Sequence, residues 1–136
     1  PLAEKSARAV GIQLPISRKV AIEICNAIRG KNIEFAKKLL DSVIAGKQAI
    51  AYKRFNGDVG HRKGNMAAGR YPMKASAEIL NIIKSAEANA QYKELMVKNL
   101  VISHISAKNG VRQFTGGRSR TLNKRTHIEV VVQEKQ

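Results

Sequence analysis

At 136 residues and 43% hydrophobic content the chain has the size of one globular domain, and its 25 Lys and Arg against 10 Asp and Glu give a formal net charge of +15. A field of that sign attracts polyanions, so a nucleic acid is the favoured partner. No apolar run approaches the ~20 residues that cross a membrane, Pro1–Gly11 mixes charged and small residues unlike a signal peptide, and the lone Cys25 excludes an internal disulfide, so we expect a cytoplasmic protein.

The first third of the chain predicts one strand and two helices. Residues 12–16 alternate large apolar residues with others, and Pro15 restricts such a strand to a sheet edge or to its own end. From Ser17 to Gly30, apolar residues recur at four-residue spacing between a capping serine and a terminating glycine, which predicts an amphipathic helix. A second helix is expected from Asn32 to Gly46, and the short link predicts that the two helices pack as neighbours.

Residues 47–72 lose any helical or strand periodicity. Glycines interrupt the segment, and its basic residues are accompanied by a single acid, Asp58. Loops of this length are uncommon in compact domains and are usually functional or disordered, so we interpret the segment as a basic insert without regular structure. A third helix is predicted from Pro72 to about Tyr92, because proline suits the first helical turn and apolar residues recur along one face.

The last third predicts a long β-hairpin. Residues 100–107 alternate and 128–132 are mostly β-branched, and both patterns are typical of strands. The connection from Lys108 to Arg125 contains glycines and basic residues but no acid. We expect it to extend beyond the core, by up to ~40 Å for an arm of about fourteen residues at ~3.3 Å each. In the free protein this arm should be mobile, since it has no apolar face whose burial offsets the entropy of ordering.

The residue types that support catalysis or metal binding are scattered. His61, His104 and His127 lie in different segments, and only the last two could face each other across the hairpin. Cys25 lies on a helix stripe, where a buried structural thiol is the better interpretation. The acids fall mainly on predicted helices, near Lys and Arg at helical spacing, which indicates solvated faces. We therefore expect no catalytic residue, no metal, no cofactor and no enzymatic activity.

The two glycine-punctuated segments indicate RNA binding. Their basic residues lack acidic neighbours, and like charges repel unless an anion such as phosphate neutralises them. The Lys37-Lys38 pair on the second predicted helix is interpreted instead as a solvated surface run. Few aromatics accompany the basic residues, so recognition of folded RNA through shape and backbone is favoured over a stacking platform. The alternatives are an architectural protein that compacts DNA or RNA, and an enzyme that acts on RNA.

Several motifs carry a family likeness when their order and spacing are taken together. They are ISRKV at 16–20, IRGK at 28–31, YKRFN at 52–56, VGHR at 59–62, GRYP at 69–72, AEANA at 86–90 and HIEVVV at 127–132. Over about residues 9–134 the pattern resembles the universal large-subunit ribosomal protein family numbered twenty-two in bacteria and seventeen in eukaryotes, in its archaeal and eukaryotic branch. The chain departs from the family at Arg18, where proline is usual, and at 114–118, where the hairpin apex is several residues shorter.

The resemblance implies an α/β (α+β) fold, in which a small antiparallel sheet packs with three helices and carries a long extended hairpin. It implies a single RNA-binding domain over 1–136, with the basic insert at 47–72 and the hairpin at 100–132. It also implies a structural constituent of the large ribosomal subunit in the cytoplasm. The implied partners are large-subunit ribosomal RNA, neighbouring ribosomal proteins and the nascent peptide, which meets the hairpin tip in the exit tunnel; no membrane or small-molecule substrate is expected.

The predicted charge distribution and the family resemblance together indicate which residues contact RNA and which line the tunnel. RNA contacts are expected at the basic positions of the first helix, the insert and the hairpin: Arg18, Lys19, Arg54, Arg62, Lys63, Arg70, Lys74, Lys108, Arg112, Arg118, Arg120, Lys124 and Arg125. The tip that lines the tunnel is expected at Gln113, Phe114, Thr115, Gly116 and Gly117.

Overall fold

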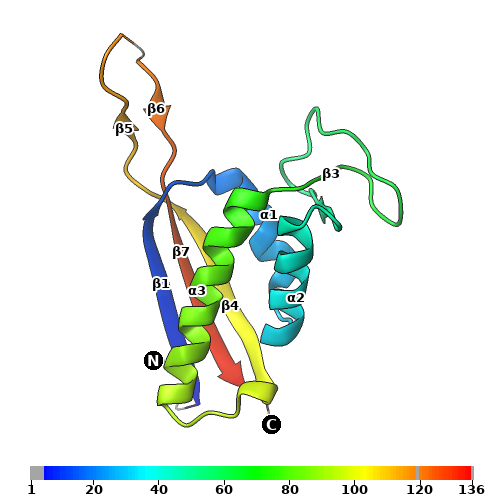
Figure 1. The fold of residues 1–136 in the computed structure, drawn as a ribbon, viewed down its shortest axis with the longest axis vertical. Helices are drawn as coiled ribbons and strands as arrows, with labels where there is room; N and C mark the ends of the chain where they lie inside the picture. Colours follow the sequence, from blue (N-terminus) through cyan, green and yellow to red (C-terminus); the bar gives the residue numbers. More distant parts are fainter. Residues whose placement is uncertain (1–4, 119, 136) are drawn as a thin grey trace.

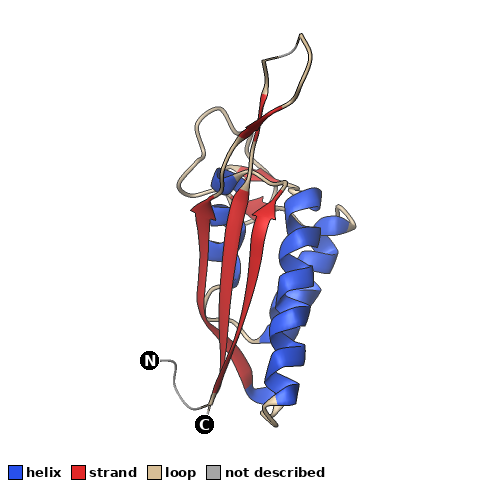
Figure 2. Cartoon of the chain, turned by 90° about the vertical axis from the view of Figure 1, so that its left-hand side faces the viewer, coloured by secondary structure: helices blue, strands red, loops and turns tan. Residues whose placement is uncertain are grey.

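A central antiparallel sheet runs along the length of the molecule (Figures 1 and 2). Its strands are β1 (Ser6–Leu14), β7 (Thr126–Glu134) and β4 (Leu100–Asn109), in that order across the sheet. The computed structural model describes residues 5–118 and 120–135; residues 1–4, Ser119 and Gln136 lie outside it, including the start of Pro1–Gly11 and one residue of the predicted hairpin connection. The sheet, the helices packed on it and the hairpin confirm the predicted fold class.

The edge strand β1 is longer than the sequence predicts, and it begins at Ser6, well before residue 12. Its inward residues are alanines and a glycine, and they lie against helix α3 (Met73–Tyr92). A Cβ atom at Gly11 would lie 2.5 Å from the Cδ1 atom of Ile82. Small residues therefore let the helix approach the sheet closely, and their weak strand preference conceals the first half of β1 from sequence-based prediction.

Helices α1 (Arg18–Ile28) and α2 (Ile33–Ile44) lie at the predicted places in the chain, but α1 packs mainly on β4 and α2 mainly on α3 rather than on each other as predicted. Gly30 and Gly46 follow them with φ of +73° and +70°, the left-handed conformation expected just after a helix. Ser17 holds the N-cap position of α1, but its side chain makes no cap hydrogen bond in the described structure. Ser17 therefore occupies the predicted N-cap position without making the side-chain hydrogen bond that caps a helix.

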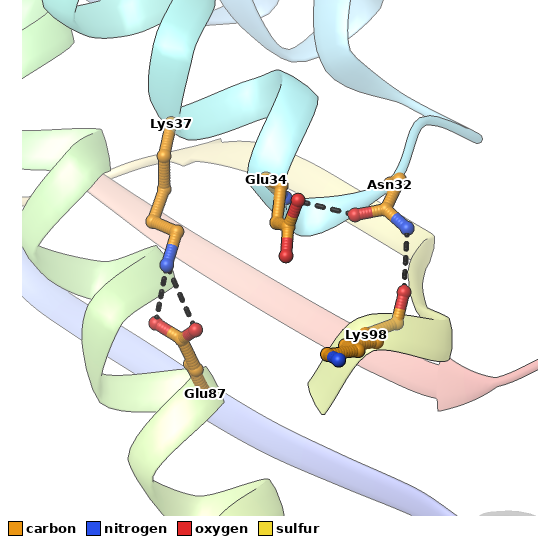
Figure 3. Close-up of polar contacts among 5 residues, drawn as sticks. All are labelled: Asn32, Glu34, Lys37, Glu87 and Lys98. Atoms are coloured by element: carbon orange, nitrogen blue, oxygen red, sulfur yellow. Dashed lines mark hydrogen bonds and ion pairs between the residues drawn. The ribbon is translucent and has the colours of Figure 1, made fainter. Parts of the chain in front are cut away.

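Polar contacts join α2 to its neighbours (Figure 3). The side-chain oxygen of Asn32 accepts a 2.9 Å hydrogen bond from the N–H of Glu34, as predicted, and its amide donates to the carbonyl oxygen of Lys98 at 2.9 Å. Lys37 Nζ donates to both carboxylate oxygens of Glu87 on α3, at 2.8 and 2.9 Å. Lys37 is thus half-buried and paired, so the prediction that it belongs to a solvated run is wrong.

Both edges of the sheet are covered by other elements. Along β1, the carbonyl oxygen of Arg8 accepts a 2.8 Å hydrogen bond from Asn89 Nδ2 on α3, and that of Ser6 accepts a 2.9 Å bond from Nζ of Lys93, the residue that follows α3. Near the start of β4, Ile102 exchanges backbone hydrogen bonds of 2.9 and 3.0 Å with residues 30–31, between α1 and α2. These contacts leave fewer free backbone groups for pairing with another chain.

The ends of the insert pair with each other. β2 (Ile50–Ala51) runs antiparallel to β3 (Gly69–Arg70), so the prediction of no regular structure is wrong at both ends of the segment. The pairing has a physical cause, because Ile50 and Tyr52 are buried in the hydrophobic core and carry the start of the insert with them. Between the two strands the chain forms the loop drawn beside β3 in Figure 1.

The hairpin continues beyond the sheet as a narrow two-stranded ribbon. A short 3-10 helix, η1 (Val97–Asn99), leads into β4, and past the end of the sheet β5 (Gln113–Phe114) pairs with β6 (Leu122–Asn123). Figures 1 and 2 show the ribbon projecting from the same end of the core as the insert. The two basic segments of the sequence therefore lie at one end of the molecule.

Candidate nucleic-acid interface

An open pocket of about 200 Å³ lies where the hairpin leaves the sheet. We call it the hairpin-base pocket, and it is lined by Ser17, Arg18, Lys19, Asn109, Arg112, Lys124 and Arg125. The first of these residues belong to the start of α1 and the rest to the two sides of the hairpin. The fold thus brings together basic residues from two distant parts of the chain, all of which the sequence predicts as RNA contacts.

Close backbone packing builds this pocket. The N–H of Gly110 donates a 2.9 Å hydrogen bond to the carbonyl oxygen of Arg125, which closes the hairpin at its base. A Cβ atom at Gly110 would lie 2.9 Å from the carbonyl carbon of Arg125 and would also press on Oε1 of Gln13. Only glycine fits this position without displacing the backbone.

The electrostatics of the hairpin-base pocket favour an anion. Its described lining residues include basic side chains from both sides and no Asp or Glu. The first turn of α1 likewise carries no acid, so the positive end of the helix dipole is not offset there. Closely spaced cations repel one another unless an anion lies among them, and a phosphate group meets that need.

Two further depressions continue from this pocket across the same end of the molecule. An insert groove of about 330 Å³ is lined by Ser17, Tyr52, Arg70, Tyr71 and Lys74 among others, and it shares Ser17 with the hairpin-base pocket. An insert pocket of about 610 Å³ shares Tyr71 with the groove and is lined by Lys47, His61, Arg62 and Lys63. We call the three depressions together the basic end; within the described residues no acid lines any of them.

Aromatic rings accompany some of these cations. The ring centroid of Phe55 lies 5.6 Å from Lys19 Nζ and 5.2 Å from the guanidinium carbon of Arg54. Arg62 lies 5.1 Å from the ring centroid of Tyr71, and its Nε donates to the carbonyl oxygen of Gly69 at 3.1 Å. These contacts hold cationic side chains over ring faces, which limits their freedom before a ligand binds.

Lys108 lies apart from the basic end. It occupies the sheet face opposite α3, where its Nζ lies 3.2 Å from Glu129, and Arg8 lies 2.9 Å from the same carboxylate. The hydrogen bond from Lys108, followed by the charges of Arg8 and Lys108, lowers the pKa of Glu129 despite some desolvation. The charge of Lys108 is therefore already partly neutralised, and the structure does not bring it together with the other predicted contacts.

The predicted tip contacts lie on the ribbon beyond the basic end. Phe114 is 71% exposed on β5, and Arg118 and Arg120 are exposed near the apex. Thr115 donates its N–H to the carbonyl oxygen of Thr121 at 3.0 Å, which keeps the two sides of the ribbon together. The ribbon thus carries its basic and aromatic side chains into solvent, away from the packed core.

The three histidines and the cysteine are not arranged as the ligands of a metal site in the described structure. His104 pairs with Val131 in the strand register and His127 with Lys108, so the prediction that the two histidines could face each other is wrong. His127 lies near the hairpin end of the sheet, and its Nδ1 accepts a 3.1 Å hydrogen bond from the N–H of Gln13. Within residues 5–118 and 120–135, no group of His, Cys, Asp or Glu is placed to hold a metal ion.

The single thiol is a core residue, as predicted. Cys25 is 1% exposed on α1, and burial raises its pKa to about 12. A neutral, inaccessible thiol is a poor nucleophile and a poor metal ligand. Separately, no helix in the described part of the chain combines the length and apolarity needed to cross a membrane.

Sequence reasoning missed the role of Glu23. This carboxylate is 1% exposed, and it accepts hydrogen bonds from the backbone N–H groups of Lys53, Arg54 and Phe55 at 3.0, 2.8 and 2.7 Å. Lys19 stands one helical turn before Glu23, and that spacing indicates an exposed ion pair rather than a buried acceptor. The prediction of a solvated face is wrong here, and no local pattern in the sequence reveals the distant donors.

Comparison with known proteins adds independent information. A family model described as ribosomal protein L22p/L17e matches residues 9–133. A large ribosomal subunit protein uL22 from Archaeoglobus fulgidus is 52% identical over 78% of this chain and 70% of its own length. Proteins of the same name from Methanocaldococcus jannaschii and Methanococcoides burtonii are 43% and 41% identical, over 96% and 97% of this chain and 89% and 91% of their own lengths.

Proposed function

Because the chain belongs to the ribosomal protein L22p/L17e family, as its sequence motifs indicate, we propose that it is a structural constituent of the large ribosomal subunit and binds ribosomal RNA through its basic end. The relatives from archaea are named as large-subunit proteins, which supports this assignment. In this proposal residues 1–136 act as one RNA-binding unit, and the function is assembly and support of RNA rather than catalysis.

The hairpin-base pocket carries the proposal. It gathers Arg18 and Lys19 with Arg112, Lys124 and Arg125 around one open depression, without an acid among its described lining residues. Guanidinium and ammonium groups at such spacing suit the phosphate oxygens of a folded RNA backbone. The insert pocket adds Lys47, Arg62 and Lys63, and the insert groove, whose lining is mostly apolar, adds Arg70 and Lys74, so the basic end includes most of the predicted contacts.

The ribbon has a different part in the proposal. Its narrow form, with one short strand pair and exposed Val111 and Phe114, suits insertion between RNA segments rather than packing on the core. Its tip, from Gln113 to Gly117, would then reach the wall of the peptide exit tunnel and meet the nascent peptide. Neighbouring large-subunit proteins are further partners, which the family membership implies.

Retention on RNA and DNA at matched salt tests the RNA-binding proposal. The protein is applied to a fragment of large-subunit ribosomal RNA and to duplex DNA of equal phosphate content, and the bound fraction is measured as salt is raised. We expect retention on RNA to persist to higher salt than retention on DNA if the basic end recognises folded RNA by its shape as well as by its charge. Equal or stronger retention on DNA would favour the architectural alternative and contradict the proposal.

A further inference from the structure

A buried carboxylate holds the start of the insert against α1. Both oxygens of Glu23 are used: Oε2 accepts from the N–H of Lys53, and Oε1 accepts from Arg54 and Phe55. The donors are successive backbone groups, and successive N–H groups that converge on one anion form a concave binding site of the kind that usually holds phosphate. In this protein the anion is an internal side chain.

The burial of Glu23 makes these hydrogen bonds important. At 1% exposure the carboxylate has lost its hydration, and none of the described cations lies within ion-pair distance of it. Charge-assisted hydrogen bonds must therefore replace the lost water, and a buried acceptor left without donors is strongly unfavourable. The conformation of residues 53–55 is consequently tied to the position of α1.

The anchored residues line none of the three depressions of the basic end, but Phe55 contacts one of its cations, Lys19. The side chain of Arg54 is exposed and lies near the ring of Phe55, and Lys19, which lines the hairpin-base pocket, also lies near that ring. Lys19 and Glu23 are one turn apart on α1. One helix therefore supplies both the anchor for the loop and one of the cations that the loop joins.

We propose that Glu23 is a positioning residue for RNA binding: its carboxylate fixes the backbone of Lys53–Phe55, so that Arg54, Phe55 and Lys19 are arranged as an RNA-phosphate contact before RNA arrives. This inference rests on the proposed RNA-binding function and deepens it. A loop ordered in advance loses less conformational entropy on binding, so preorganisation appears directly as affinity.

Replacement of Glu23 separates positioning from electrostatics because the two effects have opposite signs. Glu23→Gln removes one negative charge and so raises the net charge of the chain by one, which by itself should strengthen binding to a polyanion. It also removes one acceptor and places an amide N–H against the N–H of Lys53, which should release the loop. Glu87→Gln is the matched control, because it changes the charge equally and breaks the pair with Lys37 on the other side of the core.

Backbone hydrogen exchange and RNA affinity are measured for the full-length wild-type protein, Glu23→Gln and Glu87→Gln. In the free wild-type protein we expect the amides of residues 53–55 to be protected, unlike those of the insert loop near Asn65. Glu23→Gln should abolish that protection and weaken affinity for a ribosomal RNA fragment by about three- to tenfold, despite its extra charge. Glu87→Gln should leave the protection intact and keep the affinity within about twofold of wild type or above it.

A double-mutant cycle distinguishes positioning from general loss of structure. If Glu23 acts through Arg54, the affinity loss of Glu23→Gln with Arg54→Gln should be clearly smaller than the two single losses combined, whereas unrelated losses add. Additive losses would overturn the inference, as would unprotected amides at 53–55 in the wild-type protein. That wild-type measurement decides the anchoring even if Glu23→Gln fails to fold, and Arg54→Gln with wild-type affinity would equally overturn the proposed contact. If the wild-type protein itself does not bind RNA, the proposed function fails while the exchange data still report on the anchor.

Discussion

The hydroxyl of Thr126 donates a 2.8 Å hydrogen bond to the carbonyl oxygen of Ile16. Thr126 is the first residue of β7 and Ile16 lies two residues before α1, so the contact joins two segments that are far apart in the chain. Both residues are buried, at 0% and 4% exposure. The bond therefore helps to hold the hairpin, where Arg125 immediately precedes Thr126, next to the start of α1, where Arg18 lies, and these are the two sides of the hairpin-base pocket.

Replacement of Thr126 with Val should lower the free energy of unfolding by about 1 to 3 kcal/mol, because it keeps the shape and leaves the buried Ile16 carbonyl without its donor. Urea-induced unfolding measures this loss. Ser103→Ala is the control, since Ser103 donates a similar 3.1 Å bond to the Val131 carbonyl from an exposed position. The control should lose about 0.5 kcal/mol or less, and equal losses for the two variants would contradict the importance of the buried bond.

Replacement of Gly110 with Ala should destabilise the protein by about 1 to 3 kcal/mol, because the new Cβ meets the carbonyl carbon of Arg125, which cannot move without opening the hairpin base. Gly116→Ala is the matched control, since a Cβ at Gly116 meets nothing within 4 Å. Its unfolding free energy should stay within about 0.5 kcal/mol of wild type. Thermal and urea unfolding of both variants decide between these outcomes, and indistinguishable curves would refute the close approach.

Neutral replacement of Arg112, Lys124 and Arg125 should weaken RNA binding and its dependence on salt. If about six phosphates are neutralised, log K should fall against log salt with a slope of about −4 to −5, and loss of three contacts should reduce that slope by about 2 to 3. Replacement of the exposed Lys38, Lys84 and Lys98, none of which lines the basic end, removes the same charge. Filter binding across a salt series compares the two triple variants. Equal slopes for both would contradict the proposal that the hairpin-base pocket binds RNA phosphates.

The native thiol should resist alkylation. The folded protein keeps the proton of Cys25 up to a pH of about 12, because burial raises its pKa from an ordinary value of 9.0. The unfolded chain releases that proton near pH 9, so the stabilising contribution is fully present below pH 9 and is lost as the pH rises toward 12. Iodoacetamide at pH 8 should label the native protein slowly and the urea-unfolded protein fast. Fast labelling of the native protein would show that the α1 packing opens readily.

Features that depend on residues close together in the sequence could be predicted from it, whereas features that depend on residues far apart in the sequence could not. Helices α1, α2 and α3 depend on local apolar periodicity, and all three were predictable from the sequence. The first half of β1 was not, since its small residues have weak strand preference and the strand packs against α3, which is far away in the chain. The candidate site divides in the same way. Its Lys and Arg residues could be predicted as contacts because they are visible in the sequence. Glu23, Gly110 and Thr126, which hold those residues in place, act through partners that only the fold reveals.

The ribbon gives the sharpest contrast between core and surface. Residues 111–122, of which Ser119 lies outside the described part, form one short strand pair and expose Val111 at 65% and Phe114 at 71%. Residues 79–90 of α3 instead bury Ile79, Ile83 and Ala86 completely. Burial of apolar surface offsets the entropy of ordering in the helix but not in the ribbon.

In native-state hydrogen exchange, the amides of 111–122 should therefore exchange near the rate of an unstructured chain in the free protein, while those of 79–90 exchange only through global unfolding. Addition of the ribosomal RNA fragment should slow exchange in the ribbon if RNA orders it. Gly116→Ala serves as a control that leaves the contacts of the ribbon unchanged. Equal protection of the two segments without RNA would mean that the hairpin folds autonomously. The ribbon would then already be ordered in the free protein, and binding to RNA would change only its surroundings and not its conformation.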